Sequence, residues 1–128
     1  MQKKSKTFTA TATIGLIRGY DNQMISIVEF KEVLLAAQKK IYQDYKIGLS
    51  AKLSPCEIFF LGQNEPSMEL QFIQYPKFPQ EEAVLKKAIV ALIEIMMLEL
   101  EQNRVVIVCT DETIMLEQSE EIDPSIQL

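Results

Sequence analysis

The sequence predicts an α+β domain, a two-layer sandwich of tandem β-α-β units. Residues 8–17 alternate between apolar and small polar side chains, which is the period of a half-buried strand. Residues 26–46 and 79–102 have apolar positions at helical spacing. Apolar runs follow each of these segments. The element order is therefore β-α-β-β-α-β, with both helices on one face of a four-stranded sheet.

The first helix has a clear start in the sequence. Ser26 and Glu29 fit a capping box, in which the hydroxyl and the carboxylate satisfy free N–H groups. The second helix is predicted to have Pro79 at its first position. Between residues 88 and 98 its only charge is Glu94, so this helix must be buried on most sides.

The later strands are predicted from shorter patterns. Residues 49–54 alternate, and Pro55 then interrupts the run, which indicates an edge strand or a bulge. Residues 62–66 are typical of a turn, and a strand follows over 68–72. The run 105–109 is apolar on both faces, as in a central strand, and residues 114–116 form a short final strand.

The length and charge of the chain limit its function. Its 128 residues make one domain at 8–117, with a flexible basic N-terminal extension at 1–7 and an acidic C-terminal tail at 118–128. The net charge of -5 argues against nucleic acid as a partner. The chain has no histidine, which excludes His-dependent triads and His-based metal sites. We expect no metal and no cofactor.

The sequence also favours a cytoplasmic location. No apolar run approaches the roughly 20 residues that span a bilayer, and no secretory signal is present, so no membrane partner is expected. Cys56 and Cys109 form no CxxC pair, which favours two reduced thiols, with a single disulfide as the alternative.

One sheet face is left bare by this arrangement. It would carry Val106 and Val108 or their neighbours, and a monomer should not expose such a face. We therefore expect a homo-oligomer, with a trimer favoured.

Several segments resemble the tautomerase superfamily that includes macrophage migration inhibitory factor. They are Leu53-Ser54-Pro55 with Gly62 and Glu65-Pro66, the strand Leu70-Gln71-Phe72-Ile73, and Arg104-Val105-Val106-Ile107 with Asp111, over residues 49–112. The resemblance implies a homotrimer with small-molecule pockets between subunits and an amino-terminal proline as base. A ferredoxin-like domain is the alternative fold.

The sequence departs from that superfamily at its chemistry. The first strand begins near Phe8 and holds no proline, and the family's polar pocket positions match Val106 and Val108. The resemblance therefore implies the fold without the tautomerase activity.

Five residues are weak candidates for a site. As catalytic candidates, Lys46 could supply a Schiff-base amine if desolvated, and Asp111 beside Glu112 could do acid–base work or bind a hard cation. The binding candidates are Arg18, flanked by glycines, which could hold a small anion, and Lys52 and Glu57 near strand ends. The alternative for each is an ordinary solvated or turn residue.

Three functions follow from these observations. The first is a non-catalytic assembly or small-ligand-binding module with tautomerase-like subunits. The second is a cofactor-independent isomerase that uses a displaced base, Lys46 or Asp111. The third is a ferredoxin-like dimer that acts as a regulatory ligand-binding domain.

Overall fold

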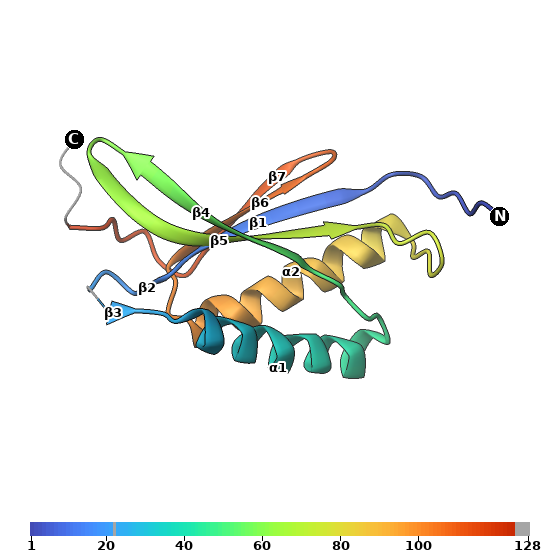
Figure 1. The fold of residues 1–128 in the computed structure, drawn as a ribbon, viewed down its shortest axis with the longest axis horizontal. Coiled ribbons are helices and arrows are strands. Elements are labelled where there is room, and N and C mark those ends of the chain that lie inside the picture. The colour runs from blue at the N-terminus through green and yellow to red at the C-terminus, as the bar shows by residue number, and fades with distance from the viewer. Residues whose placement is uncertain (22, 125–128) are drawn as a thin grey trace.

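The computed structural model describes residues 1–21 and 23–124. Figure 1 shows a twisted sheet with both helices on one side of it. The elements are β1 (Thr9–Gly15), β2 (Ile17–Arg18), β3 (Gln23–Met24), α1 (Ile27–Tyr45), β4 (Lys52–Phe60), β5 (Gln63–Ile73), α2 (Glu82–Glu99), β6 (Arg104–Cys109) and β7 (Thr113–Glu117). The expected α+β class and order of the main elements are confirmed, and the short β2–β3 ribbon is an addition.

The sheet order is β4-β5-β1-β6-β7, and every neighbouring pair is antiparallel. Each helix joins two strands that run in the same direction but are not neighbours. β5 lies between β1 and β4, and β1 lies between β5 and β6. The two β-α-β units are therefore interleaved, as in a split β-α-β arrangement, and do not sit in tandem.

The helix α1 starts at the predicted cap, but only half of the capping box forms. The backbone N–H of Glu29 donates to Ser26 Oγ at 3.0 Å. The Glu29 carboxylate accepts hydrogen bonds from Arg18 on β2. The helix ends at Lys46, which has the left-handed φ of 59° and donates its N–H to the Tyr42 carbonyl.

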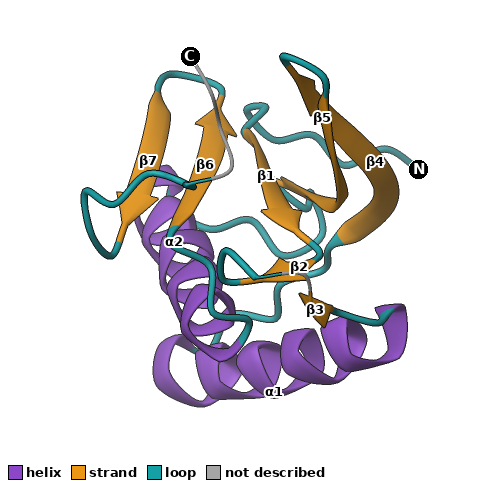
Figure 2. Cartoon of the chain, turned by 90° about the vertical axis from the view of Figure 1, so that its left-hand side faces the viewer, coloured by secondary structure: helices purple, strands orange, loops and turns teal. Residues whose placement is uncertain are grey.

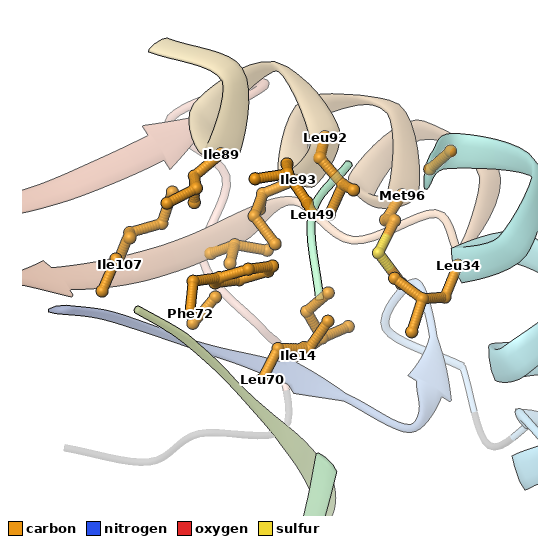
Figure 3. Close-up of a cluster of buried hydrophobic side chains, with 14 of the residues drawn as sticks. Ile14, Leu34, Leu49, Leu70, Phe72, Ile89, Leu92, Ile93, Met96 and Ile107 are labelled. Carbon is orange, nitrogen blue, oxygen red and sulfur yellow. The ribbon is translucent and has the colours of Figure 1, made fainter. Parts of the chain in front are cut away.

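The helix α2 begins later than the sequence predicts. Its N-cap is Glu81, so the prediction that Pro79 takes the first helical position is wrong. Its apolar character is confirmed, because seven of its residues are buried: Leu85, Ala88, Ile89, Leu92, Ile93, Met96 and Met97. Figure 3 shows four of them, Ile89, Leu92, Ile93 and Met96, together with the strand residues Ile14, Leu70 and Ile107. Leu34 of α1 lies beside Met96 in the same cluster.

The hairpin of β4 and β5 differs most from expectation. β4 is an edge strand, as Pro55 indicates, and Pro55 pairs with Met68 inside the ladder. The connection is only Leu61 and Gly62, both with positive φ. Residues 63–66 therefore belong to β5, although they were expected to form a turn. This extension carries Glu65 along the sheet to the level of Gly15.

The sheet face without helices is half apolar. Val105, Ile107 and Cys109 are buried toward the helices, whereas Val106 is half-buried and Val108 is 52% exposed, as expected for the open face. Thr9, Thr11 and Thr13 run along the same open face on β1, so a polar row crosses its middle.

Candidate functional site

Two cavities lie at opposite ends of β5. The first, of about 520 Å³, lies where the turn after β2, the start of β5, the α2–β6 loop and the C-terminal tail meet. The second, of about 630 Å³, lies where α1 and β5 end. Glu65 lines the first and Ile73 the second, which places the two on the order of 25 Å apart along the strand. Figure 1 shows the course of β5 between these two ends, and Figure 2 is viewed from the end that carries β2 and β3.

We call the first the carboxylate cavity, since Asp21, Glu65 and Asp123 line it. Arg104 is the one cationic residue among its described lining residues. The three carboxylates outnumber this one cation, so the net charge of the cavity lining is negative. The four charged residues come from four separate segments of the chain. A cavity of this kind favours a ligand with positive charge.

Glu65 has its place because residue 15 is a glycine. A Cβ built at Gly15 would lie 1.9 Å from Glu65 Oε1, which no real side chain permits. The same Cβ would lie 3.1 Å from Gln102 Oε1. The missing side chain at position 15 thus leaves the space that the Glu65 carboxylate occupies over β1.

The electrostatic environment of Glu65 favours its protonated form. Burial raises the pKa of the Glu65 carboxyl, and the negative charge of Asp123 raises that pKa further. A carboxylate whose pKa is raised is a stronger base than an ordinary one, and groups with shifted pKa values gather at functional sites.

Gln102 forms the inner wall of the cavity. It is 7% exposed, and its amide donates to the Ile17 carbonyl at 2.8 Å and to the Leu100 carbonyl at 3.0 Å. Both N–H groups of the amide therefore bond to backbone carbonyls, and the amide oxygen lies beside Gly15.

The acidic tail completes the cavity. Arg104 Nη1 donates to the Glu121 carbonyl at 2.6 Å, Asn103 donates to it at 3.1 Å, and the Tyr20 hydroxyl donates to it at 3.2 Å. These bonds bring Ile122 and Asp123 to the cavity wall. The part of the predicted tail beyond residue 124 lies outside the described residues.

The second cavity we call the aromatic cavity, because Tyr42, Phe72, Tyr75 and Phe78 line it. Its walls include Lys46 and the buried Leu85. Most of the residues that line this cavity are apolar or aromatic, whereas the carboxylate cavity is lined by several charged and polar residues.

The five candidates from the sequence do not come together. Lys46 lines the aromatic cavity, whereas Lys52 and Glu57 are exposed on the edge strand β4. Arg18 is ion-paired with Glu29 and Glu101. None of the five is among the lining residues of the carboxylate cavity.

Asp111 and Glu112 share a cation. Lys86 Nζ lies 2.8 Å from Asp111 Oδ2 and 2.7 Å from Glu112 Oε2. Lys86 lowers the pKa of Asp111, and the two carboxylates raise the pKa of Lys86. Burial raises the pKa of the nearby Cys109 thiol, which disfavours a thiolate there.

Sequence reasoning missed Glu65, Tyr20 and Asp21. Glu65 lies in the segment 62–66, whose residues are typical of a turn, and a turn needs no functional explanation for polar residues. Tyr20 and Asp21 lie between the first predicted strand and the first predicted helix. The signal for Glu65 is its contact with Gly15, which joins residues 50 positions apart and has no local pattern.

No helix among residues 1–21 and 23–124 is long and apolar enough to cross a membrane. In the same part of the chain, no three His, Cys, Asp or Glu side chains are grouped as a metal site would require.

Comparison with known proteins gives a structural likeness. No family model and no curated protein matches the sequence. A phage S-adenosylmethionine (SAM) lyase in complex with S-methyl-5'-thioadenosine superposes with a TM-score of 0.66 at 14% identity, over 95% of this chain and 98% of that chain. A phage SAM lyase in its apo state superposes with a TM-score of 0.69 at 16% identity and the same coverage.

These matches correct the family expected from the sequence. The tautomerase superfamily is the wrong assignment, and with it the tautomerase-like, non-catalytic module. The segments that suggested it are ordinary strands, and the all-antiparallel sheet joins them in another order. The chain shares its fold, over nearly its whole length, with a phage SAM lyase.

Proposed function

We propose that this protein is an enzyme that cleaves SAM and releases S-methyl-5'-thioadenosine. The observation that carries the proposal is the superposition over 95% of this chain and 98% of a phage SAM lyase in complex with that thioadenosine. The carboxylate cavity supports it independently, because it offers a chemical environment that suits this substrate.

Charge selects between the two cavities. SAM carries a sulfonium, an ammonium and one carboxylate, so its net charge is positive. Asp21, Glu65 and Asp123 line the carboxylate cavity, whereas Lys46 is the charged residue that lines the aromatic cavity. Unlike charges attract and like charges repel, more strongly where water is excluded. We therefore assign SAM to the carboxylate cavity.

The reaction needs no second substrate. The bond between the sulfonium sulfur and the amino-acid carbon breaks, and both electrons go to sulfur, which leaves as the neutral thioether. The four-carbon fragment then has two balanced outcomes. Its own carboxylate oxygen bonds to the carbon that sulfur left and closes a lactone, or the adjacent carbon loses a proton and an alkene forms.

Glu65 has a role in either outcome. In its ionised form the carboxylate stabilises the cationic substrate inside the cavity. If an alkene forms, the carboxylate can take the proton, because burial and Asp123 raise the pKa of this group. If the lactone forms, no base is required and Glu65 acts by holding the substrate.

The test is a direct assay of the full-length chain with SAM. Chromatography should detect S-methyl-5'-thioadenosine, and NMR of the second product should separate lactone from alkene. Glu65→Gln should lower the rate by about 10²–10⁴-fold if Glu65 is the base. Glu94→Gln, on the exposed side of α2, should match the wild type. No thioadenosine from the wild-type protein above the buffer rate would refute the proposal.

We also propose that the protein works as a homo-oligomer, with a trimer favoured and small-molecule sites near subunit contacts. The exposed apolar side chains Ile58 and Phe60 of the hairpin, and Val108 and Met115 of the open sheet face, supply a surface for these contacts.

Light scattering during size-exclusion chromatography tests the assembly. Val108→Asp should dissociate the oligomer, since a carboxylate buried without a partner is costly. Val84→Asp changes an exposed valine on α2 and should leave the assembly intact. A wild-type protein that runs as a folded monomer at micromolar concentration would contradict this proposal.

We also propose a cytoplasmic location for the protein. Cys56 and Cys109 are both free thiols, which suits a reducing compartment.

A further inference from the structure

We propose that the aromatic cavity is a second ligand site, which binds a planar aromatic molecule carrying an anionic group. This inference goes beyond the proposed cleavage of SAM and does not depend on it. It rests on the shape of the cavity, on a braced aromatic loop at its rim and on the charge of Lys46.

The cavity has the size and lining of a small-molecule site. Its volume of about 630 Å³ falls within the roughly 300–1,000 Å³ that such sites occupy. Phe72 and Leu85 form a buried apolar wall, at 1% and 4% exposure. Ser50, Gln74 and Gln80 provide a few polar groups beside it. An apolar cavity with a few polar groups favours a ligand with an apolar body.

Three aromatic rings stand at the rim and are open to solvent. Tyr42 is 59% exposed, Tyr75 53% and Phe78 63%. The Tyr75 and Phe78 rings stack, with centroids 6.1 Å apart and planes inclined by 14°. A flat aromatic ligand gains by offset stacking or edge-to-face contact with such rings.

The loop that carries this ring pair is held in place. Gln74 Nε2 donates to the Gln80 carbonyl at 2.8 Å, and the Gln80 N–H donates to Gln74 Oε1 at 2.9 Å. The Phe78 N–H donates to the Tyr75 carbonyl at 3.0 Å. One glutamine side chain thus closes the loop from residue 74 to residue 80. The rings are already positioned, which lowers the entropy that a ligand loses on binding.

The charge of Lys46 indicates which charge the ligand should carry. Lys46 is the charged residue among the described residues that line this cavity. Its backbone N–H caps α1 through the hydrogen bond to the Tyr42 carbonyl, which holds Lys46 at the cavity wall. With no carboxylate among the same lining residues, the ammonium is left to pair with an anionic group of the ligand.

The cavity is separate from the proposed SAM site. The two lie at opposite ends of β5 and share no lining residue. A ligand with net positive charge is disfavoured beside Lys46, whereas an anion is disfavoured among Asp21, Glu65 and Asp123. Binding at one site can therefore be removed without changing the residues of the other.

Calorimetric titration of the full-length protein tests this inference with two probes. Indole-3-acetate carries a carboxylate and 1-naphthyl phosphate carries a phosphate, and neither contains the nucleoside of SAM. Indole and 1-naphthol are the neutral counterparts and should bind about tenfold more weakly, which corresponds to about 1.4 kcal/mol. The loss from each anionic probe to its neutral counterpart measures the contribution of its anionic group.

The variants separate a ring effect from a charge effect. Lys46→Asn keeps a residue that tolerates positive φ and should weaken the anionic probe about tenfold, with little effect on its neutral counterpart. Phe78→Ala should weaken both. Lys31→Gln, exposed elsewhere on α1, is the matched control. Turnover of SAM should be the same in all of these proteins.

Two results would overturn the inference. One is the absence of binding by both anionic probes at millimolar concentration. The other is a probe that binds Lys46→Asn and Phe78→Ala as tightly as the wild type, because the ligand would then lie elsewhere.

Discussion

Arg18 joins the start of one helix to the end of the other. Its guanidinium donates to Glu29 in the first turn of α1 and, at 2.9 Å, to Glu101 just after α2. It also donates to the Glu99 carbonyl at 3.1 Å. The side chain is 21% exposed, so these bonds are partly shielded from water. The arginine that sequence analysis considered for anion binding thus has carboxylate partners within the chain.

Replacing Arg18 should therefore destabilise the fold. Arg18→Leu leaves two carboxylates near each other without their shared cation, and we expect the free energy of unfolding to fall by about 2 kcal/mol. Denaturation in urea at pH 7 measures it. Lys40→Leu breaks the exposed pair with Asp44 and should change stability by about 0.5 kcal/mol or less. Equal effects of the two changes would show that the Arg18 network contributes no more than a surface pair.

The sequence predicts the parts of this fold that depend on neighbouring residues. The alternation in β1 and the spacing in α1 are local, and both elements form near their expected bounds. The Glu29 side chain was expected to cap its own helix, but it accepts a hydrogen bond from Arg18 on β2. No local sequence pattern predicts this pairing.

The candidate site depends on pairing between distant segments. Glu65 lies beside Gly15 because Ser67 pairs with Gly15, a register set by the whole ladder from Ile73 onward. Asn64, Glu65 and Pro66 are residue types common in turns, and they form a strand here because the chain has already reversed at Leu61–Gly62. The residue types therefore predict most of the helices and strands. They do not predict the cavity, because its residues come together only through the pairing of distant strands.

Gly15→Ala tests that register. The new methyl group would meet Glu65 Oε1, so the carboxylate must move, at a cost of about 1–3 kcal/mol in stability. We expect the variant to remain folded and to lose SAM cleavage along with the position of Glu65. Gly48→Ala is the matched control, because nothing lies within 4 Å of a Cβ built there. Thermal unfolding and the thioadenosine assay measure both effects, and normal turnover by Gly15→Ala would contradict the assigned role of Glu65.

The raised pKa of Glu65 predicts how stability changes with pH. Folding raises the pKa of this carboxyl above its ordinary value of 4.5, so the folded state binds the proton more tightly. The stabilisation is fully present below pH 4.5 and is lost as the pH rises through the folded pKa. The Glu65→Gln variant has no carboxyl to ionise at this position, so it does not lose stability in this way. The melting temperature of the variant should therefore rise relative to that of the wild type as the pH increases from 4 to 8.

The control for the pH series is Glu57→Gln, an exposed glutamate on β4. Its melting temperature should follow that of the wild type across the range. A difference between Glu65→Gln and the wild type that stays constant from pH 4 to 8 would mean that the Glu65 carboxyl does not titrate in a buried environment.

The turn at Leu61–Gly62 offers a change that should stabilise the protein. Both residues have positive φ, 48° and 88°, in a two-residue connection between antiparallel strands, and Asn-Gly is a preferred pair for such a turn. Leucine rarely adopts this conformation, and the Leu61 side chain is 66% exposed. Leu61→Asn should therefore raise the free energy of unfolding by about 0.5–1 kcal/mol, measured by the urea midpoint at unchanged slope. Phe59→Asn, on the neighbouring strand and 72% exposed, lacks the turn conformation and should give no such gain. If Leu61→Asn lowers the midpoint, the prediction is wrong. The packing of the leucine side chain would then stabilise the protein more than relief of the backbone strain does, and an exposed leucine would find such packing against a second subunit.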